Sequence, residues 1–167
     1  MKKIIACLVV AGLLGFASNA FAFIEVPSYG ETGWQTFSHT FEESWSGFIG
    51  VAVSNFGDED VDSALLIDNF NIDILGNEGF ELNNPTGYIT LGSANIVPSF
   101  TSYNGNTYLP TEGSLMGQLW SNGAYVAIAQ QLSFAAGETF AFDWAFLAFD
   151  YAPYRDFAFL MHSDFST

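Results

Sequence analysis

Apolar side chains recur at every second position through most of this sequence, and turn-forming residues interrupt the alternation about every ten residues. Alternate residues of a β-strand face the same side of a sheet, so the pattern predicts strands with one apolar face. Many short strands separated by turn signals are typical of two antiparallel sheets packed as a β-sandwich. No segment after residue 22 keeps a helical period, which disfavours βαβ folds and their nucleotide sites.

We therefore expect an all-β, antiparallel sandwich of the jelly-roll type with nine strands. The predicted strands cover residues 34–41, 47–54, 64–73, 88–92, 94–100, 114–120, 125–134, 139–149 and 156–162. The segment Ala135-Ala136-Gly137-Glu138 is predicted to form a tight hairpin turn between two long strands.

One row of large aromatic side chains predicts where the core lies. Phe140, Phe142, Trp144 and Phe146 occupy alternate positions, so they share one face of a strand and can fill the space between two sheets. Cys7 is the single cysteine of the chain, so no disulfide can form within it and its stability must come from packing.

The first 22 residues have the three parts of a secretory signal. Lys2 and Lys3 are followed by an apolar stretch over residues 4–16 and then by the small residues Ala20 and Ala22. The apolar stretch is too short to span a bilayer with certainty. We expect cleavage after Ala22 and a secreted protein, either extracellular or periplasmic.

Two alternatives to free secretion are disfavoured. Cys7 precedes most of the apolar stretch, where a lipid-attachment cysteine could not be presented after cleavage. The most apolar later segment, residues 134–149, is interrupted by Glu138 and Asp143, and the chain ends at Thr167 without a basic tail or an anchor. We expect no membrane insertion after signal cleavage.

The charge balance limits the partners of the chain. Once residues 1–22 are removed, 18 acidic residues stand against Arg155 alone, a formal charge of −17 with the histidines neutral. Such a charge excludes ordinary nucleic-acid binding, disfavours anionic membranes and favours solubility or cation binding. Residues 23–167, about 145 in number, are enough for a single sandwich domain.

Two stretches of the sequence resemble a known family. They run from residues 32–37 through Asp-Ser-Ala-Leu-Leu-Ile-Asp-Asn-Phe at 62–70, and from 112–114 through Asp-Trp-Ala-Phe-Leu at 143–147 to 150–159. They resemble the exported β-sandwich domains of PEP-CTERM-type bacterial surface proteins, which are associated with extracellular matrix and exopolysaccharide. Two features depart from that family: the Pro-Glu-Pro sorting signal is missing, and Arg155 stands where a small polar residue is expected.

The order of these motifs is also unusual. In the family a Gly-Phe-Glu stretch such as 79–81 opens the domain and a stretch such as 62–68 closes it, whereas here the closing stretch comes first. Circular permutation explains this if the tail at 161–167 lies near Phe23 and the old termini are joined through 74–78. The alternative is a fragment that spans the end of one domain and the start of the next.

A weaker resemblance to galactose-binding-like carbohydrate-binding modules implies a structural calcium ion. In those modules carboxylates on the opening and closing strands often hold calcium, and Glu81 and Asp68 occupy comparable positions. The alternative is that both are solvated surface acids. The acids at residues 58–62 fail the full calcium-loop pattern, since Ser63 and Asn69 stand where glycine and glutamate are required, and we interpret them as a charged turn.

Aromatic rings near turns are the candidate ligand contacts, because such rings stack on the flat faces of sugars. Trp34 and Trp144 lie within alternating strands and are interpreted as core. The candidates for binding a polysaccharide or other surface glycan are Trp120, Trp45, Tyr103 and Tyr108.

Catalysis is poorly supported by the sequence. Glycosidases need two carboxylates across a cleft, whereas the predicted strands offer isolated acids. His39 and His162 have no recognisable nucleophile or metal motif, and His39 is predicted to be a partly exposed strand residue. We expect a non-catalytic module that binds polysaccharide; the alternatives are a purely structural matrix protein and, more distantly, a glycoside hydrolase.

Overall fold

The structure, a computed structural model, describes residues 27–55, 60–72, 77–122, 125–154 and 156–164. Every regular element in this part of the chain is a β-strand, and all the strand pairings are antiparallel. The prediction of an all-β, antiparallel fold is therefore confirmed. Within the same residues, no helix is long and apolar enough to cross a membrane.

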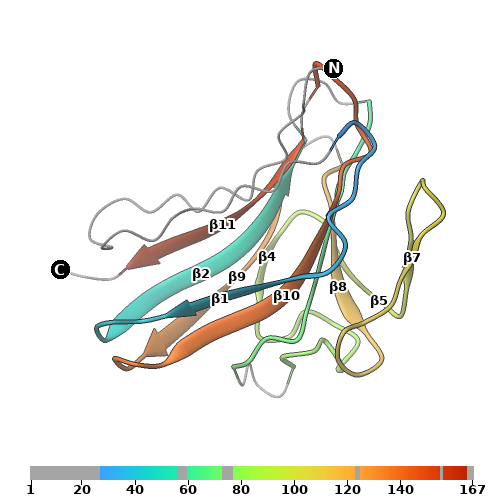
Figure 1. Cartoon of the computed structure of the whole chain (residues 1–167). Helices are drawn as coiled ribbons and strands as arrows, with labels where there is room; N and C mark the ends of the chain where they lie inside the picture. The colour runs from blue at the N-terminus through green and yellow to red at the C-terminus, as the bar shows by residue number, and fades with distance from the viewer. Residues whose placement is uncertain (1–26, 56–59, 73–76, 123–124, 155, 165–167) are drawn as a thin grey trace.

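Two sheets hold most of the strands (Figure 1). Sheet A has the order β1 (Gln35–Thr40), β10 (Thr139–Leu147), β3 (Ala64–Asp68), β8 (Met116–Trp120) and β5 (Ala94–Val97). Sheet B has the order β11 (Phe157–Asp164), β2 (Trp45–Ser54), β9 (Tyr125–Phe134) and β4 (Ile89–Leu91). A separate hairpin pairs β6 (Phe100–Thr101) with β7 (Thr107–Tyr108).

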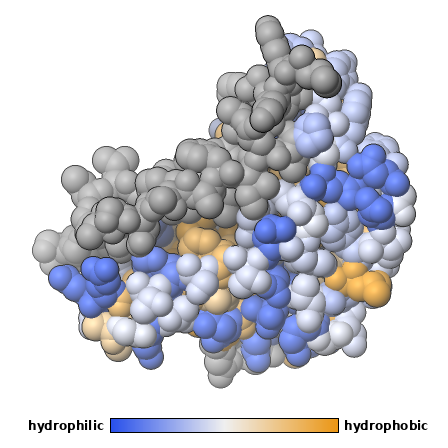
Figure 2. All heavy atoms as spheres, in the orientation of Figure 1, coloured by the Kyte–Doolittle hydropathy of each residue, from blue (hydrophilic) through white to orange (hydrophobic). Residues whose placement is uncertain are grey.

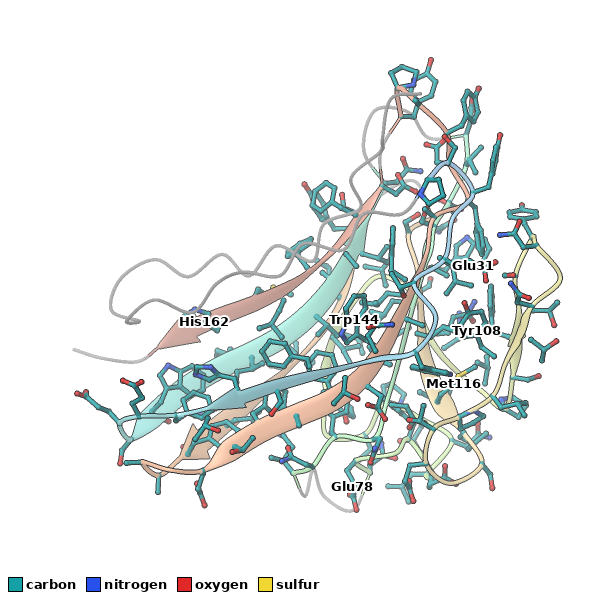
Figure 3. All side chains as sticks on the ribbon, viewed as in Figure 1. Glu31, Glu78, Tyr108, Met116, Trp144 and His162 are labelled. Atoms are coloured by element: carbon teal, nitrogen blue, oxygen red, sulfur yellow. The ribbon has the colours of Figure 1, made fainter. Side chains whose placement is uncertain are left out.

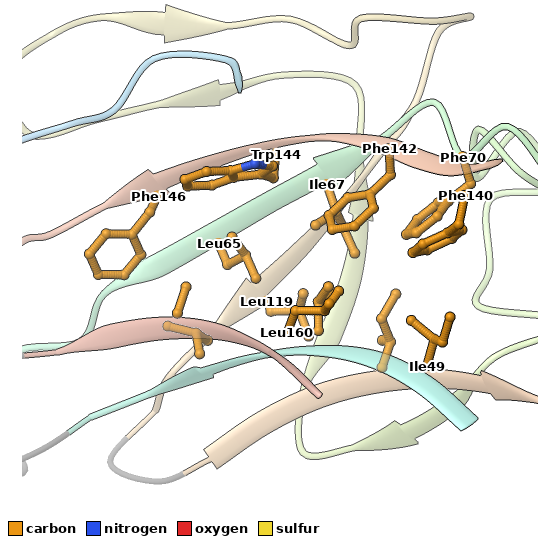
Figure 4. Packing of buried hydrophobic residues seen from close by; sticks show 14 of the residues in the cluster. Ile49, Leu65, Ile67, Phe70, Leu119, Phe140, Phe142, Trp144, Phe146 and Leu160 are labelled. Carbon is orange, nitrogen blue, oxygen red and sulfur yellow. The ribbon is translucent and has the colours of Figure 1, made fainter. Parts of the chain in front are cut away.

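The predicted aromatic row fills the space between the two sheets. Phe140, Phe142, Trp144 and Phe146 all project from β10 into one apolar cluster and are at most 5% exposed. Figure 4 shows them above side chains of the opposite sheet, among them Ile49 of β2 and Leu160 of β11. Burying rings on this scale supplies packing energy without a disulfide.

The outer face of sheet A is buried at its centre as well, over β3, β8 and the second half of β10, whereas the outward positions of β1 stay exposed. A second apolar cluster lies on it, built on Leu66, Met116, Ala145 and Leu147 and covered by Tyr108 of the hairpin. Figure 1 shows the hairpin beyond β8 and β5, on the side of sheet A that faces away from sheet B. Strand β3 is consequently buried at all five positions, which explains why residues 64–67 are continuously apolar and do not alternate.

The predicted hairpin at Ala135–Glu138 is wrong. The turn is tight, with Gly137 at φ 88° and the amide of Ala135 donating to the Glu138 carboxylate, but β9 belongs to sheet B and β10 to sheet A. The chain therefore passes from one sheet to the other at this turn. Local turn chemistry specifies the reversal of the chain, whereas packing over long sequence distances decides which strands pair.

Two predicted strands also end differently. The strand expected over 64–73 stops at Asp68, because Asn69 adopts a left-handed conformation with φ 53° that an extended strand cannot continue. The segment expected as one strand over 94–100 is divided into β5 and β6, and β7 was not predicted. The signal at 1–22, Phe23, and residues 74–76 of the proposed permutation join lie outside the described residues.

The aromatic core can be tested by truncating one ring. Phe142 is 1% exposed and contacts Phe37, Phe70 and Phe140, so Phe142→Ala should lower the free energy of unfolding by about 3–5 kcal/mol. Urea denaturation measures the loss. Leu109→Ala is the control, since Leu109 is 61% exposed and its truncation should change stability by less than about 0.5 kcal/mol. Equal losses in the two variants would contradict the assigned core.

Candidate functional site

Two of the four predicted ligand-binding aromatics are held in the cluster on the outer face of sheet A. Tyr108 is 7% exposed, and its hydroxyl donates to the Glu31 carboxylate at 2.9 Å. Tyr108 therefore lacks the exposed ring that stacking on a sugar would need. Trp120 is half-buried: its indole N–H donates to Asp62 at 2.8 Å, and its ring packs against Phe149. Trp120 is thus less open to a ligand than an exposed ring would be.

Trp45 lies at the start of β2 and is half-buried. Its ring stacks on Phe41 at a centroid distance of 5.4 Å and meets His162 edge-on at 6.3 Å. His39 is partly exposed, as predicted, and its ring contacts Phe41 edge-on at 4.8 Å. Burial lowers the pKa of His39, and the charge of nearby His162 lowers it further. The contacts of Trp45 and His39 are therefore mainly packing contacts between aromatic rings of the two sheets.

Tyr103 is the predicted candidate that the structure leaves most open. It lies in the turn between β6 and β7 and is 73% exposed. Its ring meets Phe149 edge-on at 4.6 Å. Phe149 is followed directly by a loop that carries Tyr151 and Tyr154. Tyr103 therefore contacts the residue at which this tyrosine-bearing loop begins.

Three further tyrosines gather at this end of the molecule. Tyr29 stacks on Tyr151 with centroids 6.0 Å apart and planes inclined by 29°, and Tyr154 meets Tyr151 edge-on at 5.7 Å. Tyr29 is 48% exposed and Tyr151 is 44% exposed. We call Tyr29, Tyr103, Tyr151 and Tyr154 the tyrosine cluster. Its members come from three loops distant in sequence: Tyr151 contacts Tyr29 and Tyr154, and Tyr103 neighbours Asn104, whose side chain donates to the Tyr29 carbonyl.

The backbone holds Tyr29 in an unfavourable conformation. Its φ is 58°, in the left-handed region that costs a non-glycine residue about 1–2 kcal/mol. Three hydrogen bonds fix the segment: the Tyr29 amide donates to the Asp150 carbonyl, the Gly30 amide donates to the Pro27 carbonyl, and the Asn104 side chain donates to the Tyr29 carbonyl. Strained residues that the surrounding structure maintains often have a functional role.

Glu31 ties the hairpin to the N-terminal segment (Figure 3). Its carboxylate accepts hydrogen bonds from the side chains of Asn104, Asn106 and Tyr108, at 2.9, 3.0 and 2.9 Å. Burial alone would raise the pKa of Glu31, but the hydrogen bonds together outweigh it and the pKa lies below its ordinary value. The ionised carboxylate therefore keeps the hairpin turn, and with it Tyr103, next to Tyr29.

Sequence reasoning missed Tyr29, Tyr151 and Tyr154. The available signal was the short run Tyr151-Ala-Pro-Tyr154, which has two aromatic residues and a proline outside any alternating strand. Proline at such a position indicates a loop, and aromatic residues in loops are candidate contacts. The position of Tyr29 beside this run had no signal in the sequence, because Tyr29 and Tyr151 lie 122 positions apart (151 − 29).

The two acids proposed as calcium ligands both hold the loop at residues 111–115. One Asp68 carboxylate oxygen accepts from the amides of Thr111 and Glu112 at 2.6 and 3.0 Å and from the Thr111 hydroxyl at 3.2 Å. Glu81 accepts from the amides of Ser114 and Leu115, both at 2.8 Å. The resemblance predicted that Asp68 and Glu81 share one site. In the structure both carboxylates bind the backbone of the same loop.

This arrangement does not fit a calcium site. The second Asp68 oxygen accepts from the Asn69 amide at 2.8 Å, so donors occupy both oxygens, and Asp68 is 0% exposed. A carboxylate surrounded by N–H and O–H donors has few lone pairs left for a cation. Over the described ranges, no group of three or more acidic, histidine or cysteine side chains is placed to hold a metal ion.

Asp143 and Asp68 lie directly opposite each other on β10 and β3. Asp143 accepts from the Thr36 hydroxyl at 2.6 Å and from Asn69 at 3.0 Å, and Asp68 is covered by the 111–115 loop. Burial would raise the pKa of Asp143, but its hydrogen bonds lower the pKa below the ordinary value. The loop keeps substrate from Asp68, so the two acids do not act as an accessible catalytic pair.

An apolar cavity lies between the sheets, lined by residues such as Phe70, Tyr88 and Phe140. Its volume of about 10 Å³ has room for roughly one water molecule. Figure 2 shows a mostly polar surface with small, separate apolar patches on the face in view. The tyrosine cluster is therefore a surface platform, and a ligand would contact it from solvent.

No family model, curated protein or solved structure matches this chain. The resemblance to PEP-CTERM-type and galactose-binding-like domains thus stays a prediction from the sequence motifs. The geometry of the described residues is the basis for the function proposed below.

Removing the charge of Glu31 should loosen the hairpin. The lowered pKa means that Glu31 contributes stability above its ordinary pKa near 4.5 and loses that contribution as pH falls through the folded value. Glu31→Gln should therefore unfold more easily at neutral pH, and the difference from the unmodified protein should shrink below pH 4.5. Thermal unfolding across this pH range measures it; a difference that does not depend on pH would contradict the assigned role.

The misfit to calcium leads to a second test. Asp68→Asn should lower the free energy of unfolding by about 1–3 kcal/mol, because an amide NH₂ would face N–H donors. Adding a chelator should leave the unfolding midpoint of the unmodified protein unchanged. Urea denaturation with calcium and with chelator checks both points, and a calcium-dependent midpoint that disappears in Glu81→Gln would restore the calcium site.

Proposed function

We propose that this chain is an exported, non-catalytic β-sandwich module that binds polysaccharide through the tyrosine cluster. The observation that carries the proposal is the exposure of Tyr29, Tyr103 and Tyr151, by 48%, 73% and 44%, at one end of the molecule. Rigid tyrosine rings bind sugars by stacking, and their hydroxyls add hydrogen bonds that orient the ligand.

The strand order supports a jelly-roll form of the sandwich. Strands β1 to β5 alternate between sheet A and sheet B along the chain, and β8 to β11 do the same. Lectin domains are among the proteins that use jelly rolls. The motif resemblance to matrix-associated and galactose-binding-like domains agrees with this form. The fold by itself assigns no ligand, so the proposal depends on the tyrosine cluster.

Charge favours one class of polysaccharide. The sequence has 18 acidic residues and 3 basic ones, so long-range repulsion opposes anionic chains. Glu31 brings a negative charge close to the cluster, since Asn104 contacts both Glu31 and the Tyr29 carbonyl. We therefore propose neutral or amine-bearing polysaccharides as ligands.

The second candidate is a structural protein of the surface matrix that uses no ligand site. The burial of β3 at every position and the second apolar cluster favour it, because a rigid, tightly packed sandwich suits a building block. The strain at Tyr29 favours the binding module, since a building block has no need to hold an exposed tyrosine at φ 58°.

A glycan array with neutral, amine-bearing and anionic polysaccharides tests the proposal. Titration with the strongest neutral or amine-bearing ligand should show about tenfold weaker binding for Tyr151→Ala and Tyr103→Ala, or about 1.4 kcal/mol each. Tyr125→Ala is the matched control, because Tyr125 is 53% exposed but its ring contacts Phe159.

Each other result has a defined meaning. The absence of binding at any concentration would favour the structural protein. Binding that survives in both cluster variants would move the site elsewhere. Release of shortened sugars during long incubation would overturn the non-catalytic assignment.

A further inference from the structure

Two exposed tyrosines far apart in sequence are held against each other by hydrogen bonds of their own segments. The Tyr29 amide donates to the Asp150 carbonyl at 3.1 Å, and the Ala152 amide donates to the Ser28 hydroxyl at 3.3 Å. These two bonds lie on either side of Tyr151 in the sequence. The rings of Tyr29 and Tyr151 stack with centroids 6.0 Å apart. The backbone therefore sets the distance between the two phenols.

Tyrosine rings contact each other at this one place in the part of the chain that the structure describes, which includes all seven tyrosines. Tyr29 stacks on Tyr151, and Tyr154 meets Tyr151 edge-on at 5.7 Å. The other four contact rings of different types, in the pairs Tyr88–Phe70, Tyr103–Phe149, Tyr108–Trp34 and Tyr125–Phe159. Tyr29 and Tyr151 are also exposed, so reagents in solvent reach both rings.

The chain lacks the usual covalent cross-link of exported proteins. Cys7 is its single cysteine, so no disulfide can form within it. The predicted export would place the chain in an oxidising environment, where other exported domains gain stability from disulfides. A contacting pair of phenols is a second kind of side-chain pair that oxidation can join.

We propose that Tyr29 and Tyr151 form an oxidative cross-linking site, at which a dityrosine bond joins the N-terminal segment to the loop after β10. The oxidant is a peroxide acting through a haem peroxidase. Each phenol loses one electron and one proton, and the two phenoxyl radicals form a C–C bond between ring carbons next to the C–O carbons. The hydrogen on each joined carbon moves to the phenol oxygen and restores both rings. The peroxide takes up the two electrons and two protons and becomes two water molecules.

Proximity makes the coupling intramolecular. Tyr151 already contacts Tyr29, so its effective concentration there is far above that of a second copy in dilute solution. The acidic chains also repel one another, which slows encounters between copies. The rings need only turn about their side-chain bonds to bring their edges together, because the hydrogen-bonded backbone segments are already adjacent.

The bond would stabilise the fold by restricting the unfolded chain. Tyr29 and Tyr151 lie 122 positions apart (151 − 29), so the cross-link closes most of the domain into one covalent loop. Cross-links that close long loops remove many conformations from the unfolded state. This inference concerns covalent chemistry and does not rest on the binding of polysaccharide.

Treating the exported, processed protein with a haem peroxidase and hydrogen peroxide, at low protein concentration and without glycan, tests the site. We expect dityrosine fluorescence in a monomeric product whose mass is lower by two hydrogen atoms. Peptide mapping should find Tyr29 joined to Tyr151. The thermal unfolding midpoint should rise by about 5–15 °C.

Three phenylalanine variants locate the bond. Tyr29→Phe and Tyr151→Phe keep a ring for stacking but remove the phenol that forms the radical, so each should abolish the rise in the midpoint. Tyr125→Phe is the matched control, because Tyr125 is also exposed but contacts Phe159, and it should cross-link like the unmodified protein. Circular dichroism before oxidation verifies that each variant is folded.

Three results would overturn the proposal. One is the absence of a cross-link under conditions that couple free tyrosine. Another is a product made only of linked copies, and the third is a bond between Tyr151 and Tyr154 that leaves the midpoint unchanged. Because the assay contains no glycan, these results leave the proposed function untouched, and a glycan array without binding leaves the cross-link untouched.

Discussion

The double-sided burial at the centre of sheet A is the constraint on which the rest of the structure depends. Its inner face packs on sheet B through the aromatic row of β10, and its outer face needs a separate cover. The β6–β7 hairpin supplies that cover, and Glu31 fixes the hairpin through three side-chain hydrogen bonds. Asn104, which follows Tyr103 in the hairpin turn, also donates to the Tyr29 carbonyl. The contacts that hold the hairpin over sheet A therefore also bring Tyr103 close to Tyr29.

The strands were predictable because their signal is local. Alternation identified residues 125–134 with both ends correct, and it placed the β10 aromatic row in the core. Sheet membership was not predictable from local pattern, as the turn at 135–138 shows. A tight turn can return a strand beside its neighbour or carry it to the opposite sheet, and the difference lies in long-range packing of residues such as Phe41 and Phe134, whose rings stack at 4.3 Å.

The candidate site was predictable only where exposure follows from a turn. Tyr103 lies at the turn of a hairpin and is open, as expected. Tyr108 and Trp120 also lie near turns, but the hairpin folds back on sheet A and encloses them, which no local pattern reports. The stacking of Tyr29 on Tyr151 requires two loops far apart in sequence to meet, so it could be found only once the sandwich was assembled.

The acidic residues explain how the chain holds its loops with so few cations. Glu31, Asp68 and Glu81 accept hydrogen bonds from N–H or O–H donors on segments distant in sequence, and Glu138 accepts one within its own turn. Charge-assisted hydrogen bonds of this kind are stronger than neutral ones, so carboxylates can fasten loops without counter-ions. Other carboxylates, such as those of Glu42 and Glu43, are exposed. Their charge opposes anionic partners over long range, which is why neutral or amine-bearing polysaccharides are the proposed ligands of the tyrosine cluster.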